Sequence, residues 1–261
     1  MIRALSTAAT GMEAQQTRLD VTANNMANVS TTGFKKSRAE FQDLMYQTLR
    51  APGGATGTNS VNPTGVQVGM GVRTVATQRM HTQGTPVQTG NALDVAIEGP
   101  GFFRLTMPTG ELAYTRDGSF KRDTEGRLVN ADGYPLDADI QIPADAEGII
   151  IGADGLVTAK LPGNNTPVEL GQIELSNFAN PAGLSANGRN LYFETASSGN
   201  PVSGAPGEEG VGTLAQNQLE SSNVQIVEEM IDLISGQRAY EINSRVIRAA
   251  DEMLQQTANL K

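Results

Sequence analysis

Apolar side chains recur every seven residues at both ends of the chain. Near the N-terminus the repeat consists of Leu5, Met12, Leu19 and Met26. Toward the C-terminus it consists of Ile226, Leu233, Tyr240, Ile247 and Leu254, and Val246, Met253 and Leu260 widen the stripe. A spacing of seven is typical of the seam of a coiled coil. We therefore predict two terminal helices that pair through these positions.

The expected bounds of these helices follow from capping residues. Gly33 comes after the β-branched pair Thr31-Thr32, and a glycine there can adopt the left-handed conformation that ends a helix. We expect the first helix to end near Gly33. Ser221, Ser222 and Asn223 are candidate N-caps for the second helix.

Two arrangements of the terminal helices are compatible with the repeat. They can form a hairpin that packs on the middle of their own chain, or they can pair with each other and also with neighbouring molecules. The second arrangement is favoured, because a single pair of helices covers only one side of each apolar stripe. The pattern therefore predicts a chain that associates with copies of itself.

The middle of the chain has the pattern of antiparallel β-structure. Stretches rich in Gly and Pro, at residues 51–71 and 195–213, flank it. Between them lie short runs of two-residue alternation at 93–97, 140–142 and 168–175. We expect turns with positive φ at four dipeptides: Asp117-Gly118, Asp132-Gly133, Asp154-Gly155 and Asn187-Gly188. We expect the aromatic pairs Phe102-Phe103 and Tyr192-Phe193, with Tyr114 and Phe120, to lie in the β-core, a subunit interface being the alternative.

The predicted fold is mixed and mainly β. Residues 1–33 and 217–261 are expected to form a discontinuous coiled-coil domain. Residues 34–90 are expected to form an extended linker with a β-hairpin, with apolar anchors at Phe41, Leu44, Met45 and Tyr46. Residues 91–216 are expected to form an antiparallel β-rich domain.

Composition and charge exclude several classes of function. The chain has no Cys, which rules out disulfides and thiolate chemistry, and His81 is its only His. The net charge is -9 and the acidic residues gather in the middle, which argues against nucleic acid or an anionic membrane as partner. The sequence lacks an apolar run long enough to cross a membrane and a secretory signal pattern, so we expect either a cytoplasmic protein or export without a cleavable signal.

Candidate catalytic residues lack specificity. The pairs Asp137/Asp139 and Glu208/Glu209 are acidic, but short acidic pairs in loops are usually solvated surface. The Asp-Gly dipeptides lack the ligand spacing of a calcium loop, and the Gly-rich pairs at 69–71 and 99–101 do not open helices. We predict no catalytic residue, no cofactor and no metal site.

Three segments together resemble the rod and hook family of axial proteins of the bacterial flagellum. LDVTANNMANVSTTGFKKSRAEF at 19–41 is similar to the rod signature of that family, with Asn24, Asn25, Asn28, Thr32, Gly33 and Phe34 in its fixed positions. DVAIEGPGFFRL at 94–105, with residues 113–136, resembles its central β motif, and residues 221–247 resemble its C-terminal helix. The length and the segment at 41–53 are similar to distal-rod members, with another rod protein of similar length as the alternative.

The resemblance implies a structural subunit of a rigid helical tube that acts as a drive shaft across the periplasm. The implied partners are copies of itself, proximal rod proteins, hook or hook-junction proteins, the surrounding bushing rings, the rod cap and the flagellar type III export apparatus. The interface expected from the repeat and the resemblance together comprises Leu5, Met12, Leu19, Met26, Asn25, Asn28, Gly33, Phe34, Leu233, Tyr240, Ile247 and Leu254. Outside this class, the alternative is a β-rich binding module tethered by a coiled coil.

Overall fold

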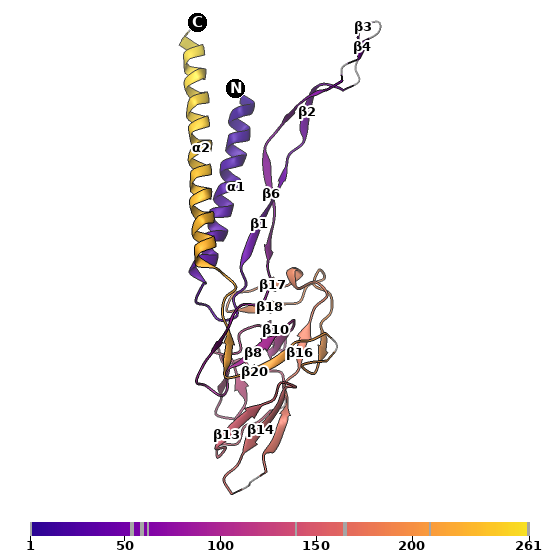
Figure 1. The fold of residues 1–261 in the computed structure, drawn as a ribbon, viewed down its shortest axis with the longest axis vertical. Coiled ribbons are helices and arrows are strands. Elements are labelled where there is room, and N and C mark those ends of the chain that lie inside the picture. The colour runs from indigo at the N-terminus through magenta and orange to yellow at the C-terminus, as the bar shows by residue number, and fades with distance from the viewer. Residues whose placement is uncertain are drawn as a thin grey trace. The chain divides into compact units, whose positions relative to one another are not determined.

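The structure is a computed structural model that describes residues 2–52, 55–57, 60, 61, 63–138, 140–163, 166–208 and 210–259. The chain divides into two compact units. Unit 1 comprises the described parts of Met1–Ala27, Ser37–Gln78 and Gln225–Lys261, and unit 2 comprises Asn28–Lys36 with Arg79–Val224. Figure 1 labels several elements of each unit, and each unit is described by itself.

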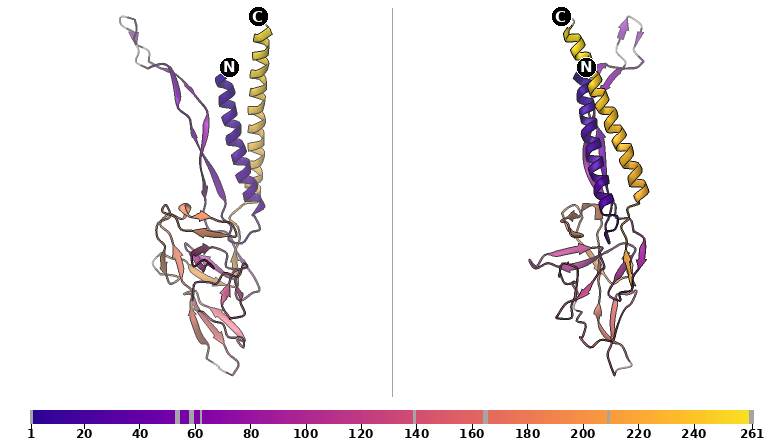
Figure 2. Two further views of the ribbon diagram at one scale, coloured as in Figure 1. Left: turned by 180° about the vertical axis from the view of Figure 1, so that it is seen from behind. Right: turned by 90° about the vertical axis from the view of Figure 1, so that its left-hand side faces the viewer.

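Two long helices form the first part of unit 1. They are α1 (Ile2–Ala27) and α2 (Ile226–Asn259), and they lie side by side in all three views of Figures 1 and 2. Gly11 lies beside Asn243, and Gly236 lies beside Leu19, so residue numbers rise along one helix as they fall along the other. The helices therefore pair, as the two heptad repeats predicted, and their orientation is antiparallel.

Two-stranded ribbons form the second part of unit 1. Strand β1 (Ser37–Asp43) pairs with β6 (Val72–Arg79), β2 (Tyr46–Arg50) with β5 (Val66–Gly69), and β3 (Ala55–Gly57) with β4 (Ser60–Val61). The ribbon is tied to α1 at Thr10, whose hydroxyl accepts a hydrogen bond from the Val72 amide at 3.4 Å. Among its described residues Met45 is 87% exposed, which leaves apolar surface on an element only two strands wide.

Unit 2 is antiparallel β-structure, as predicted. Its largest sheet has the strand order β17 (Ser185–Ala186), β18 (Leu191–Phe193), β10 (Leu112–Thr115), β9 (Phe102–Thr106), β16 (Leu175–Asn177) and β19 (Val202–Gly204). A second sheet consists of β13 (Gly148–Ile151), β14 (Leu156–Lys160) and β15 (Val168–Gln172). The remaining strands form three pairs: β8 (Val95–Glu98) with β20 (Thr213–Gln216), β7 (Pro86–Gln88) with β21 (Gln218–Glu220), and β11 (Lys121–Arg122) with β12 (Leu128–Val129). A short 3-10 helix, η1, spans Pro181–Gly183.

Strand β9 separates two apolar clusters because neighbouring side chains of a strand point to opposite faces. Phe103 and Leu105 belong to the main core of unit 2. Phe102 belongs to a second, aromatic cluster with Tyr114, Phe178 and Tyr192. The expectation that the aromatic residues lie in the β-core is confirmed, with Phe193 packed at the edge of the main core.

A side chain closes one edge of the second sheet. The Gln216 side chain accepts a hydrogen bond from the Ile151 amide at 3.2 Å and donates one to the Ile149 carbonyl at 2.9 Å. The same amide group also donates to the Ala92 carbonyl at 2.7 Å. Gln216 thus occupies the backbone groups that the edge of β13 offers.

Both predicted helix bounds are wrong. Helix α1 ends at Ala27, before Gly33, because the Asn25 side chain bonds both backbone groups of Ser37 and the chain turns at Asn28. Gly33 does have positive φ (67°), but it serves a later turn. Helix α2 begins at Ile226, so none of the expected caps directly precedes it. Asn223 instead bonds Lys36 and Met80, and Ser222 bonds the Val224 amide.

Three of the four turn predictions are confirmed and one is wrong. Gly133, Gly155 and Gly188 have positive φ of 85°, 82° and 79°. Gly118 does not, and its carbonyl accepts hydrogen bonds from the Val95 and Phe120 amides. A Cβ at Gly118 would overlap the Val95 carbonyl oxygen, so the glycine allows a close approach of β8 and does not form a hairpin turn.

Candidate assembly surfaces

The heptad repeats predicted nine seam residues, of which Ile226 is 51% exposed. Seven of them are half-buried in the chain: Leu5, Met12, Leu19, Met26, Leu233, Ile247 and Leu254. Tyr240 is 41% exposed. The seam is completed by glycines, since a Cβ at Gly236 would lie 3.0 Å from a methyl group of Leu19. These side chains therefore hold α1 against α2, and each retains surface toward the outside.

Polar contacts set the register of the two helices. Asn25 is buried and its amide donates to Glu229 at 3.2 Å, a residue that is itself 5% exposed. Arg18 and Asp232 form an ion pair at 2.7 Å, with both side chains largely in solvent. The buried hydrogen bond is worth more than the exposed ion pair, because solvent and salt screen the latter.

Helix α2 has a second apolar face that the sequence analysis missed. Val227, Ile231 and Ile234 are 70%, 61% and 46% exposed, and Met230 is 50% exposed. Gly236, which faces α1, lies nine positions after Val227, and at roughly 100° per residue this places the two half a turn apart. In the sequence this second face is marked by apolar residues at i, i+4 and i+7, a helical spacing. The heptad interpretation assigned only the face that forms the seam with α1.

The second face continues toward the C-terminus. Ile242, Val246 and Met253 are 58%, 43% and 50% exposed. Val246 and Met253 were expected to widen the seam, and at roughly 100° per residue they lie about a quarter turn from Gly236, on the flank between the seam and the outer face. Leu260 lies outside the described residues. An exposed apolar stripe of this length on one helix is typical of a protein interaction surface.

The remaining predicted interface residues are engaged within their own unit. Phe34 is 9% exposed, and Gly33 lies so close to Arg116 that a Cβ would stand 2.7 Å from its carbonyl carbon. Asn28 accepts a hydrogen bond from the Thr31 hydroxyl at 3.1 Å. The part of these residues in assembly stays a prediction, and their geometry indicates an indirect one, in which they shape the turn after α1.

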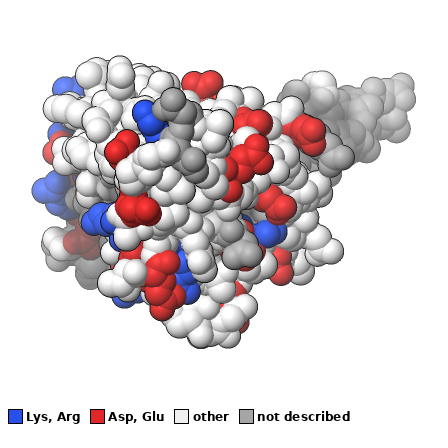
Figure 3. Space-filling view, turned by 90° about the horizontal axis from the view of Figure 1, so that it is seen from below, with Lys and Arg blue, Asp and Glu red and all other residues white. Residues whose placement is uncertain are grey.

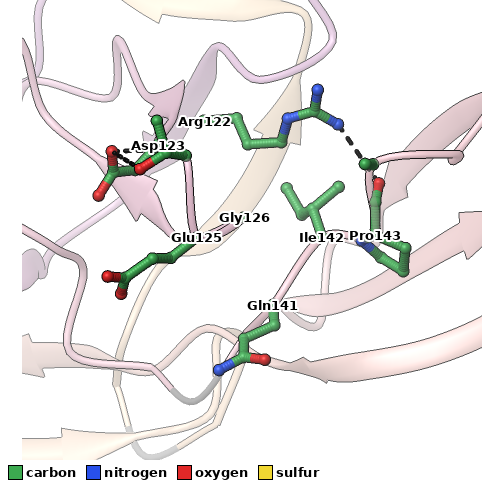
Figure 4. Close-up of a pocket in the computed structure, with 9 residues that line it drawn as sticks. Arg122, Asp123, Glu125, Gly126, Gln141, Ile142 and Pro143 are labelled. Carbon is green, nitrogen blue, oxygen red and sulfur yellow. Dashed lines mark hydrogen bonds between the residues drawn. The ribbon is translucent and has the colours of Figure 1, made fainter.

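A cavity of about 360 Å³ lies on the hairpin of β11 and β12 in unit 2 (Figure 4). Arg122 donates to the Pro143 carbonyl at 3.3 Å across it. A hydrogen bond from the Thr124 amide, with the neighbouring Arg127, holds the pKa of Asp123 below its usual value. Most lining side chains are exposed, and the Thr124 hydroxyl donates a hydrogen bond to the carboxylate of the preceding residue, Asp123, at 3.3 Å, a local contact within the turn. The cavity has the features of a surface hollow.

Each candidate acid pair has one member outside the residues that the structure describes. Asp137 forms an ion pair with Arg104, and Asp139 and Glu209 lie outside the described residues. Among the described residues no three acidic or His side chains converge as metal ligands. Figure 3 shows acidic side chains dispersed over one face of the molecule, with basic ones between them. None of the described helices has a stretch apolar enough to span a bilayer.

Two paired terminal helices and an antiparallel β-structure inserted between them define the architecture of the chain. Comparison with known proteins identifies the family that shares it. Residues 5–35 match the flagella basal body rod protein family, residues 96–159 the FlgE/F/G D1 domain of flagellar hook proteins, and residues 215–260 the C-terminal region of flagellar basal body rod FlgEFG proteins. The chain belongs to the family of flagellar hook and basal-body rod proteins.

Several relatives from distant bacteria match the chain over its full length. The flagellar basal-body rod protein FlgG of Borreliella burgdorferi is 52% identical over 100% of this chain and 99% of its own length. The FlgG proteins of Caulobacter vibrioides and of Buchnera aphidicola from Schizaphis graminum are 49% and 48% identical, with full coverage of both chains. The family resemblance read from the three sequence segments is confirmed, and the chain is a structural subunit of the flagellar rod.

Proposed function

We propose that this chain polymerises with copies of itself into the distal part of the flagellar rod, a stiff helical tube that carries torque to the hook. The observation that supports it is the apolar outer face of α2, which remains after α1 has covered the seam. A face of this kind on one subunit, meeting a different surface on the next, produces a heterologous contact, and such contacts build open helical polymers.

The helix pair is the part of the chain proposed to form the inner tube. Copies of α2 would bury Val227, Ile231 and Ile234 against helices of neighbouring subunits. Fully burying a side chain of this size stabilises by about 1.5–3 kcal/mol. Each subunit would bury three such residues, and the contact would repeat along the filament. The free energy of association per subunit would then exceed that of a single contact in a dimer.

The experiment compares two aspartate substitutions with a matched control. Ile231→Asp places a charge on the outer face, and we expect the chain to keep its α1–α2 pair and to lose polymerisation. Leu19→Asp places the charge in the seam, and we expect it to lose the helix pair as well. Val202→Asp is the control, because Val202 is 55% exposed on β19 of unit 2.

Electron microscopy and sedimentation of concentrated protein measure assembly, and far-ultraviolet circular dichroism measures helix content. Filaments from the Val202→Asp chain and none from the Ile231→Asp chain support the proposal. Full-length filaments from the Ile231→Asp chain would overturn the assignment of the outer face.

The ribbon of residues 37–78 is proposed to bridge subunits and to stiffen the rod. Tyr46, Leu49 and Val75 are 54%, 56% and 57% exposed on it. Two-stranded elements are marginally stable alone, so a neighbouring subunit would cover and stabilise this one. Deleting residues 46–63 should leave α1 and α2 paired and should lower the bending stiffness of filaments in electron micrographs. Unchanged stiffness would remove the bridging role.

The finer partners follow from this placement. The proposed contacts are proximal rod proteins at one end, hook or hook-junction proteins at the other, bushing rings around the tube, and the rod cap during growth. We propose passage to the periplasm through the flagellar type III export apparatus, without a cleaved signal. Neither a nucleic acid nor a membrane is proposed as partner, and the acidic balance of the chain supports this.

A further inference from the structure

The chain passes four times between its two units. The passages fall after residues 27, 36, 78 and 224. Three segments of unit 2 adjoin these passages: residues 28–36, 79–84 and 218–224. Each of the three contributes to one group of polar residues around the buried Glu220. We call this group, which comprises Lys35, Thr82, Gly84, Arg116, Glu220 and Asn223, the Glu220 cluster.

The carboxylate of Glu220 is the centre of the cluster and is 1% exposed. One of its oxygens accepts hydrogen bonds from the Lys35 ammonium group and, at 2.8 Å, from the Gly84 amide. The other accepts from Arg116 at 3.3 Å. Lys35 also donates to the Thr82 carbonyl at 2.8 Å. A single side chain of the last segment thus bonds both earlier segments.

Backbone groups connect the same three segments. The Gly33 amide donates to the Glu220 carbonyl at 2.8 Å, and the Met80 amide donates to the Lys36 carbonyl at 2.9 Å. Asn223 accepts from the Lys36 amide at 2.7 Å and donates to the Met80 carbonyl at 2.9 Å. The first segment is therefore held along its length by residues that come much later in the chain.

Burial makes these contacts interdependent. Lys35 and Arg116 are 0% and 3% exposed, and burial lowers the pKa of Lys35 while the charge of Glu220 raises it. A charge that loses its partners in such a place is strongly destabilised, whereas the complete network is not. A partly formed cluster is thus less stable than either the complete cluster or the solvated, undocked segments.

We propose that the Glu220 cluster is a conformational latch. It makes the docking of the segments 28–36 and 79–84 on the rest of unit 2 conditional on the docking of the segment 218–224. The three segments then dock together or release together. The start of the β-structure cannot be fixed before nearly the whole chain is present. This device lies within one molecule and is independent of the proposed polymerisation.

Amide hydrogen exchange of the full chain tests the latch, because it reports opening residue by residue. Glu220→Gln removes the charge and keeps the size of the side chain. We expect exchange at Gly33, Lys36, Met80 and Asn223 to become at least tenfold faster together, while the Leu105 and Ala113 amides in β9 and β10 stay unchanged. Glu174→Gln is the matched control, since Glu174 is an exposed carboxylate paired with Arg104 in the same unit.

Local acceleration confined to Gly84, whose amide bonds the carboxylate directly, would overturn the latch, as would no acceleration. Should Glu220→Gln open the whole of unit 2, the β9 and β10 amides would accelerate too, and Asn223→Ala then decides. Asn223 does not bond the amides of Gly33 or Gly84 in the described structure, so their acceleration in that variant supports the latch, and slow exchange there refutes it.

Discussion

His81 gives unit 2 a specific sensitivity to acid. Its ring lies edge-on to Phe102 and Tyr192, with centroids at 5.5 and 5.6 Å, and its Nδ1 is buried without a hydrogen-bond partner among the described residues. Burial is the main cause that lowers its pKa from 6.5 to about 4, and the positive charges of Lys35, Arg116 and Arg79 add to it. Protonation would place a charge in a buried site, where a hydrogen bond to the Pro181 backbone offsets only a small part of the cost of burial.

The sign of the effect follows from linkage. Because the folded pKa is below the unfolded value, the unfolded chain binds more protons between pH 6.5 and 4, so the free energy of unfolding falls as the pH falls through that window. The stability that depends on a neutral His81 ring is fully present above pH 6.5 and is lost below pH 4. A shift of this size corresponds to about 3 kcal/mol.

His81→Gln isolates this contribution, because the chain has no other histidine. Urea unfolding of both proteins at pH 7 and pH 4 measures the loss, and we expect the parent chain to lose about 3 kcal/mol more than the variant. The single imidazole signal in a proton NMR titration should have its midpoint near pH 4. A midpoint near 6.5, or equal losses in both proteins, would refute the reasoning.

Further outcomes concern the packing. Leu105→Ala in the main core should lower the free energy of unfolding by about 2–5 kcal/mol in urea titrations, and a loss below 1 kcal/mol would contradict its burial. Gly118→Ala should cost about 2 kcal/mol or more by the same measurement, because its Cβ overlaps the Val95 carbonyl; a neutral effect would show that β8 shifts freely. Arg18→Met should lower the free energy of unfolding of the helix pair by less than about 1 kcal/mol, because its ion pair with Asp232 is partly exposed. Glu229→Gln should lower it by about 1–3 kcal/mol, because it alters a buried hydrogen bond to Asn25. Thermal unfolding of both variants measures the two losses, and the opposite order would contradict the assignment.

The periodic features of the fold followed from sequence, and the features that depend on distant residues did not. Heptads at Leu5 and Leu233 predicted the helix pair because burial of one face imposes that period. The end of α1 was missed because Asn25 bonds Ser37, a contact that no local capping rule contains. Gly118 was read as a turn residue, although the reason for glycine is a strand that passes close to it.

The candidate surfaces show the same division. The outer face of α2 was recoverable from the spacing of Val227, Ile231 and Ile234, and it was overlooked because the seam explained the apolar residues first. The contact between Lys35 and Glu220 joins positions 185 residues apart, so no local sequence pattern could mark the two residues as a buried ion pair. Single-sequence patterns carry no information on such pairs.

Gln216 has a consequence for the proposed polymer, in which copies of the chain lie close together. An exposed strand edge has unpaired backbone groups that can pair with a strand of another molecule, and repeated pairing of this kind produces amyloid-like aggregates. The Gln216 amide imitates a peptide unit and binds one amide and one carbonyl of β13. In the proposed polymer, these two groups are not offered to a strand of a neighbouring subunit.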